Sequence, residues 1–95
     1  MAIQRRYKLS LQVKLDQLWH QGYTILERWE LLAWFEKERL TNVVWREIQE
    51  LWMESYELEE NERPLDVIKC DQTSSPQTFI IIQTERTVEI SELSS

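Results

Sequence analysis

Chain-breaking residues are nearly absent from the first two thirds of this sequence, and that scarcity limits the folds open to it. Gly22 is the only glycine, and the two prolines, Pro64 and Pro76, both lie late in the chain. The residues before Pro64 are rich in Glu, Leu, Gln and Arg, which favour helices. The most strand-like segment comes afterwards, as a β-branched run at 78–84 that follows a polar loop at 71–77. The sequence therefore predicts an α+β fold, in which a three-helix unit packs on a small antiparallel sheet or hairpin from the C-terminal third.

A length of 95 residues fits one domain, 1–95. We divide it into a basic extended arm (1–9), three helices (11–59), strands (65–90) and a tail (91–95). So short a chain buries only about 60–65% of its unfolded surface, so large side chains must supply much of the core. Five tryptophans are available for this purpose, and all five fit a core. Because Trp is also enriched at binding hot spots, one or two of them are alternatively left for a partner. They are Trp19, Trp29, Trp34, Trp45 and Trp52.

The segment 7–15 carries two competing patterns. Its odd positions are apolar and alternate with polar residues, as in a strand. Leu11, Leu15 and Leu18, however, are spaced as on one face of a helix. We favour a helix over about 11–21 that begins after Ser10 and ends at Gly22, which suits a left-handed cap.

A second helix is predicted from about residue 25 to Leu40. Thr24 and Glu27 match a capping box, with Thr24 as the N-cap and Glu27 three residues later. The middle of this segment is apolar on more than one side, so the helix is either central to the fold or faces a partner. We take Trp34 and Phe35 as candidate anchors for a protein partner.

The third predicted helix, 42–59, begins after Thr41 and has a single apolar stripe. Its other side is acidic, and residues 47–66 carry eight acidic side chains against one arginine in a chain whose net charge is −6. Such a surface repels phosphate backbones and attracts a partner with a basic surface, or it simply keeps the protein soluble. We assign electrostatic preference in partner binding to Glu47, Glu50 and Glu54.

The C-terminal third is predicted to hold strands at 65–70 and 78–84, with 87–90 continuing the sheet after a bend. In the middle strand, Ile80 and Ile82 fall on one face and Phe79 on the other. A strand that is apolar on both faces must be covered on both. The helices supply one cover, and the other is a partner chain, a second copy or the rest of the sheet. Phe79, Ile80 and Ile82 form the second candidate surface.

Candidate catalytic and metal-binding residues are few. The single histidine and single cysteine, His20 and Cys70, have no metal-ligand spacing, and a Cys–His dyad would still need an orienting group and an oxyanion hole. We interpret Cys70 as a small buried residue and His20 as a partner of a helix dipole. No catalytic residue, cofactor or metal site is predicted, and the protein is not expected to be an enzyme.

The same composition indicates a cellular setting. A lone thiol points to a reducing compartment, and no apolar run approaches the about 18 residues that span a bilayer. The N-terminal residues lack the apolar stretch of a signal peptide. These features predict a soluble, cytoplasmic protein without a membrane span.

Three helices followed by a hairpin is also the element order of a winged helix-turn-helix. There the third helix would read DNA, but its glutamates oppose phosphate binding, and positive charge is concentrated in Arg5, Arg6, Lys8 and Lys14. We therefore predict a non-enzymatic protein-interaction module, such as an adaptor, assembly factor or inhibitor, with a homodimer as one form of partnership. The alternative is a small winged-helix-like DNA-binding transcriptional regulator with a basic N-terminal arm, although nucleic acid is the disfavoured partner.

Overall fold

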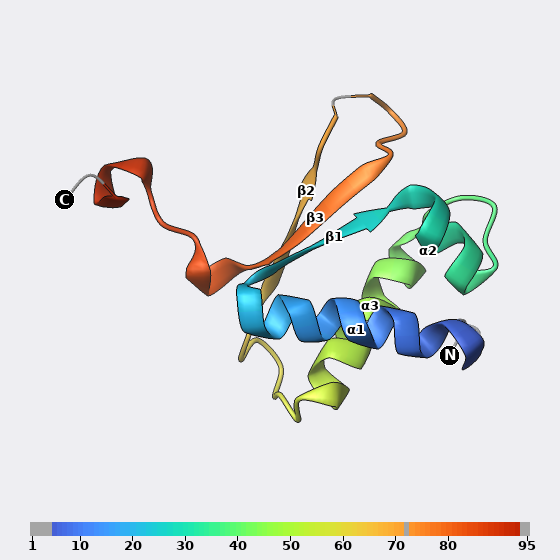
Figure 1. Cartoon of the computed structure of the whole chain (residues 1–95), viewed down its shortest axis with the longest axis horizontal. Helices are drawn as coiled ribbons and strands as arrows, with labels where there is room; N and C mark the ends of the chain where they lie inside the picture. The colour runs from blue at the N-terminus through green and yellow to red at the C-terminus, as the bar shows by residue number, and fades with distance from the viewer. Residues whose placement is uncertain (1–4, 72, 94–95) are drawn as a thin grey trace.

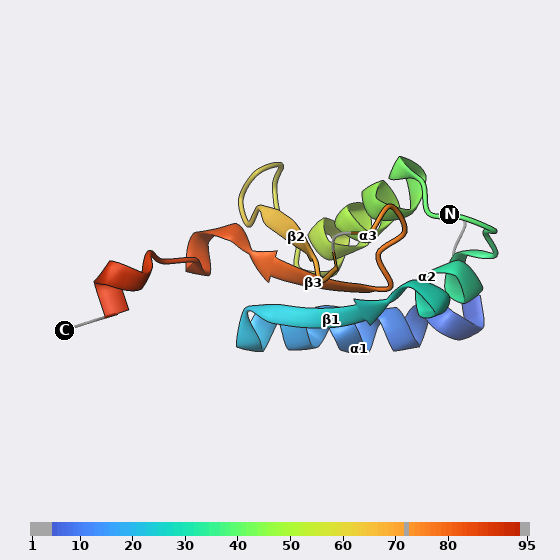
Figure 2. The same cartoon turned by 90° about the horizontal axis from the view of Figure 1, so that it is seen from above.

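The computed structural model describes residues 5–71 and 73–93 and shows α-helices packed on one face of a three-stranded antiparallel sheet (Figures 1 and 2). This arrangement confirms the predicted α+β class. Along the chain the elements are α1 (Arg5–Gln21), β1 (Tyr23–Glu27), α2 (Arg28–Phe35), α3 (Asn42–Ser55), β2 (Leu65–Lys69) and β3 (Thr78–Gln83), followed by the short 3-10 helices η1 (Thr84–Arg86) and η2 (Ile90–Leu93). The spatial order of the strands is β1-β3-β2, so β3 is the middle strand.

The core lies between the inner face of the sheet and the helices. Along β3 every second residue is buried, so Phe79 and Ile81 point inward whereas Ile80 and Ile82 point to the other face, as the sequence predicted. Gln83 is also buried, and its side-chain amide donates to the carbonyl of Leu18 at 2.7 Å, tying β3 to the end of α1. The buried apolar cluster comprises Leu11, Leu15, Leu18, Leu26, Leu31, Trp34, Phe35, Val44, Ile48, Leu51, Trp52, Phe79 and Ile81.

Helix α1 begins earlier than expected. Residues 5–9, predicted as part of an extended basic arm, are helical, and the remainder of that arm (1–4) lies outside the described residues. Good helix formers continue back to Arg5, and Tyr7 packs against the core. The competing strand pattern arose because Leu9 and Val13 are apolar but exposed on the solvent side of the helix. The predicted end is confirmed, since Gly22 follows Gln21 with φ +88°.

The segment 23–27 forms β1 and not the first turn of a helix, so the capping box assigned to Thr24 and Glu27 is wrong. Thr24 is buried and donates to the side chain of Gln17 at 2.8 Å. The box lies three residues later, where Glu27 is the N-cap and Glu30 accepts from its backbone N–H at 3.1 Å. Pairing with β3 outweighed local capping chemistry here.

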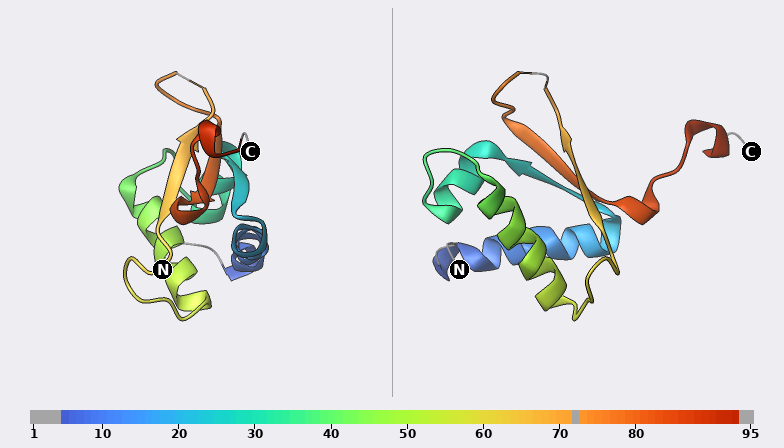
Figure 3. Two further views of the ribbon diagram at one scale, coloured as in Figure 1. Left: turned by 90° about the vertical axis from the view of Figure 1, so that its left-hand side faces the viewer. Right: turned by 180° about the vertical axis from the view of Figure 1, so that it is seen from behind.

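Three further boundaries differ from the prediction. Helix α2 ends at Phe35, five residues early, because Glu36 adopts the left-handed conformation. Helix α3 begins after Thr41 as predicted but ends at Ser55, and Glu57 then takes φ +52°. The predicted strand at 87–90 is absent: after η1 the chain leaves the body of the molecule (Figure 3). Of the predicted tail, 91–93 belong to η2 and 94–95 lie outside the described residues.

Gly22 generates the first testable expectation. Its backbone is left-handed, and a Cβ there would lie 2.6 Å from Cδ of Arg86. We expect Gly22→Ala to lower the free energy of unfolding by about 1–2 kcal/mol, the cost of holding an L-residue in this conformation. Urea denaturation measures the change, with Gln21→Ala as the neighbouring control. Equal stability of the two variants would contradict the assigned role of the turn.

Candidate functional site

The outer face of the sheet is a contiguous apolar surface that the fold leaves uncovered. Helices α1 and α3 lie on the opposite side, below the sheet in Figure 1. In the register, Tyr23 stands opposite Ile82, and Ile25, Ile80 and Ile68 form one row across all three strands. Their relative exposures reach 44% for Tyr23, 42% for Ile25 and 46% for Ile68, while Ile80 and Ile82 are half-buried by their neighbours. We call these five residues the open face.

Acidic groups mark two ends of the open face. Asp66 lies beside Ile82 on the β2 edge, and Glu27 lies beside Thr78 on the β1 edge. Each carboxylate accepts a threonine hydroxyl, from Thr84 at 2.8 Å for Asp66 and from Thr78 at 2.9 Å for Glu27. Arginine and lysine do not occur at the paired strand positions of this face. The surface therefore has an apolar centre and negative ends.

Two of the anchors expected from the sequence are buried. Trp34 and Phe35 have relative exposures of 5% and 2% and belong to the core cluster. As exposed anchors they were wrong, because both side chains pack into the core, whereas Trp29 on the same helix is the exposed tryptophan, at 68%. Phe79 likewise points inward, with its ring 5.0 Å from that of Trp45. Of the second candidate surface, Ile80 and Ile82 remain on the outside.

The acidic residues assigned to partner preference lie on the helical side of the molecule. Glu50 and Glu54 are exposed on α3, and Glu47 is half-buried. Since α3 packs on the inner face, these groups and the open face are on different sides of the sheet. They do not form one continuous surface with Ile80 and Ile82.

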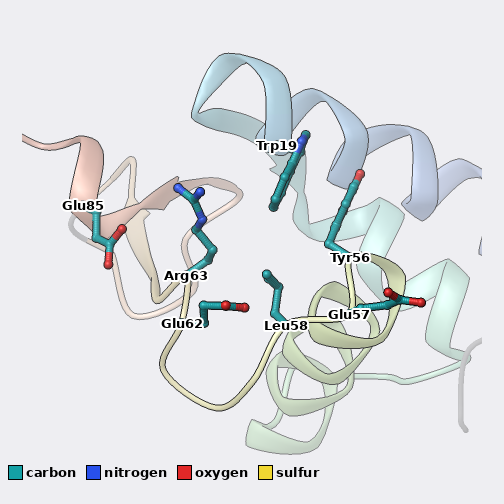
Figure 4. Close-up of a pocket in the computed structure, with 7 residues that line it drawn as sticks. All are labelled: Trp19, Tyr56, Glu57, Leu58, Glu62, Arg63 and Glu85. Atoms are coloured by element: carbon teal, nitrogen blue, oxygen red, sulfur yellow. The ribbon is translucent and has the colours of Figure 1, made fainter.

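A groove between the ends of α1 and α3 is the principal alternative site (Figure 4). Its volume is about 480 Å³, and it is lined by Trp19, Tyr56, Glu57, Leu58, Glu62, Arg63 and Glu85. The Trp19 ring stacks on Tyr56 with centroids 4.4 Å apart, and the Arg63 guanidinium lies 5.4 Å from the Trp19 ring. The aromatic surface in this groove is thus already engaged by the protein's own side chains.

Tyr56 joins the two helices at this groove. Its hydroxyl donates to Asp16 on α1. Burial, together with that hydrogen bond and the negative charge of Asp16, raises the pKa of Tyr56 to about 12. The phenol is therefore held in its neutral, donating form, which suits a structural contact between α1 and α3.

The two residues considered for catalysis, His20 and Cys70, lie near opposite ends of the sheet. His20 precedes Gly22, whose carbonyl pairs with Gln83, whereas Cys70 pairs with Thr78 at the other end of β3. Five residues of strand span about 17 Å, so His20 and Cys70 do not form a dyad. Cys70 is exposed, which corrects its assignment as a buried residue. Over 5–71 and 73–93, His, Cys, Asp and Glu residues form no cluster of three or more suited to a metal ion.

Three residues of the open face escaped sequence reasoning. Tyr23 and Ile25 alternate with buried Thr24 and Leu26, which is a strand pattern that the apparent capping box concealed. Ile68 lies in a strand that was predicted but whose faces were not assigned. The alternation in β1 was the available signal for the first two.

Comparisons with protein-family models, curated proteins and solved structures give no match for this chain. Among the described helices, none combines the length and the apolar character needed to cross a membrane. The geometry of the sheet is accordingly the main guide to a binding site.

The pKa of Tyr56 yields a pH-dependent expectation. An unfolded tyrosine ionises near pH 10, whereas folded Tyr56 keeps its proton to about pH 12. Between these values the unfolded state binds fewer protons, so the contribution of Tyr56 to stability is lost as pH rises. Urea titrations at pH 9 and pH 11 should show a larger loss for the wild type than for Tyr56→Phe. Equal losses of stability in the two proteins would show that the ionisation of Tyr56 does not contribute, because all other titrating groups are common to both.

Proposed function

We propose that this chain is a non-enzymatic protein-interaction module that docks a partner protein on the open face. The supporting observation is the row of Ile25, Ile80 and Ile68 across a sheet whose other face is already packed against helices. Contiguous apolar patches on soluble proteins commonly mark interaction sites. The adaptor, assembly-factor and inhibitor roles all use a surface of this kind.

The magnitude of burial indicates how such a partner must bind. Fully burying an isoleucine is worth about 1.5–3 kcal/mol, and the open-face residues are already about half covered, so each gains roughly 1 kcal/mol. Five such residues supply about 5 kcal/mol, against an association cost of about 4–15 kcal/mol. A partner therefore needs polar contacts at the rim in addition to the apolar centre.

Charge complementarity favours a partner with basic residues flanking an apolar segment. Asp66 and Glu27 lie at diagonally opposite corners of the open face. Two strand spacings and four residues of strand separate these corners by about 16 Å. A helix rises about 16.5 Å over eleven residues, which is three turns, so a helix with basic residues at i and i+11 and apolar residues at i+4 and i+7 matches this face.

A winged-helix-like DNA-binding regulator is the second candidate. The order of helices and hairpin favours it, since α1, α2 and α3 precede the β2–β3 hairpin. The exposed Glu50 and Glu54 on α3 oppose it, because they would face phosphates. Duplex DNA binding at low salt that is lost in an Arg5→Ala, Arg6→Ala variant would favour the regulator over the protein-interaction module.

Site-specific photo-crosslinking tests docking on the open face. A benzophenone amino acid at Ile80 is expected to capture one predominant protein from the cells that produce this chain, and the same adduct should form from Ile25. The matched control places the probe at Leu9, which is 73% exposed on α1. An Asp66→Lys change should weaken the Ile80 adduct by opposing a basic partner.

Equal capture from Ile80 and Leu9 would refute the proposed site, as would no adduct from Ile80 in an otherwise folded protein. Circular dichroism verifies the fold of each variant, because Ile80 is half-buried and its replacement must not disrupt the sheet.

A further inference from the structure

Strand β2 has an edge that no other described strand pairs with. Thr84 donates to the carbonyl of Pro64 at 2.9 Å, and Cys70 donates to that of Thr78 at 3.0 Å. In an antiparallel ladder hydrogen-bonded pairs alternate, so the even-numbered residues of β2 bond to β3. The N–H and C=O groups of Leu65, Val67 and Lys69 consequently point away from β3, to the edge. Such an edge is a template for an added strand.

An apolar groove lies beside this edge, between β2 and α3. One part has a volume of about 240 Å³ and is lined by Trp45, Val67, Lys69 and Phe79. The adjoining part, about 90 Å³, is lined by Trp45, Ile48, Gln49, Leu65, Val67 and Ile81. Val67 remains 43% exposed although it faces the inner side of the sheet. An edge with a pocket for alternate side chains is the arrangement that binds extended peptides by strand addition.

The C-terminal segment 87–93 has the complementary character. Val88, Ile90 and Leu93 are 55%, 87% and 71% exposed, and none of them belongs to the core. Thr87-Val88-Glu89-Ile90 has the alternation of a strand but pairs with no strand of the described residues. Ile90 begins η2, a single short 3-10 turn that must unwind when the segment adds as a strand. In Figures 1 and 2 this segment runs away from the body of the molecule.

The segment is poorly placed to reach the edge of its own β2. Arg86 donates to the carbonyls of His20 at 3.4 Å and Trp19 at 3.3 Å, which holds the start of the segment at the end of α1. From β3 to the far side of β2 is two strand spacings, about 10 Å, and crossing it uses roughly three extended residues. Residues 87–89 would be consumed in the crossing, so Val88 could not enter the groove together with Ile90.

We propose that the chain forms a reciprocal dimer in which segment 87–93 of each copy adds as a strand to the β2 edge of the other. Val88 and Ile90 enter the Trp45–Val67 groove, and main-chain hydrogen bonds form with Leu65, Val67 and Lys69. This interface uses the edge and the inner groove, so it forms without covering the residues of the open face.

Charge selects the register of the added strand. With an antiparallel strand and Ile90 opposite Val67, Val88 lies opposite Lys69 and Ser91 opposite Asp66. Moving the strand by two residues, with Val88 opposite Val67, would set Glu89 opposite Asp66, and like charges directly opposite are destabilising. The favoured register also places Thr87 opposite Cys70 of the second copy, in a pair whose Cα atoms are about 4.5 Å apart.

The mass of the full chain in solution tests the dimer. Sedimentation equilibrium should give two 11.6-kDa chains for the wild type and one for Ile90→Asp, whose change lies in an exposed segment that the fold does not need. Val67→Pro should also give one chain, because it removes an edge donor while leaving the ladder to β3 intact. A mixture of the two variants should restore a two-chain species, since one supplies an intact edge and the other an intact segment. Ile80→Lys should remain dimeric, which separates this result from any failure of docking on the open face.

A disulfide tests the register. Thr87→Cys should form a covalent dimer under mild oxidation, and peptide mapping by mass spectrometry should show Cys70 linked to position 87. Cys70 is exposed and so is available for this bond. Within one chain the two positions lie at opposite ends of the β2–β3 hairpin, so the link must form between copies. Cys70→Ser should abolish that link, and Glu89→Cys is the displaced control. A monomeric wild type, a dimer that survives both Ile90→Asp and Val67→Pro, or preferential linkage from position 89 would overturn the proposal. Loss of the dimer in Ile90→Asp but not in Val67→Pro would place the segment elsewhere and overturn it as well.

Discussion

Strand β3 holds the molecule together because both of its edges and one of its faces are used. β1 and β2 pair with its two sides, and Phe79 and Ile81 join the core with the leucines of α1 and α3. Gln83, which is buried, fixes the end of α1 through the carbonyl of Leu18. The alternation that sends Phe79 inward also sends Ile80 and Ile82 outward, so the open face is a direct consequence of a strand apolar on both sides. Over residues 5–71 and 73–93 this face stays uncovered, since Tyr23, Ile25 and Ile68 remain exposed.

Strongly periodic segments were predictable from the sequence. The apolar stripe of α3, the leucines of α1 and the β-branched residues of β3 each gave the right element, and Gly22 gave the right helix end. β1 was not found because Thr24 and Glu27 satisfy a local capping pattern, and only the distant β3 makes a strand the better solution. Local patterns are weak wherever long-range pairing decides the conformation.

The candidate site was predictable only in part, because it too depends on pairing between distant strands. Alternation along one strand identified Ile80 and Ile82, but the face is completed by β1 and β2, whose register no local pattern specifies. Trp34 and Phe35 show the opposite error. An apolar surface all round a helix is compatible with exposure or with a central position, and in α2 both occur: Trp34 and Phe35 face the core, whereas Trp29 is exposed.

Negative charge is found on the helical side of the molecule and at the ends of the open face. The glutamates of α3 lie on the helical side, where they act on an approaching basic protein over a Debye length of about 8 Å at physiological salt. Asp66 and Glu27 act locally at the ends of the open face. A strand added to the β2 edge would direct Glu89 to the same side as Ile68, because opposed residues in a sheet share a face. Self-association would therefore widen the open face to four strands and place the Glu89 carboxylate beside the row of Ile25, Ile80 and Ile68. The added negative charge increases the preference of the open face for a basic partner. The isoleucines that such a partner would bury stay uncovered.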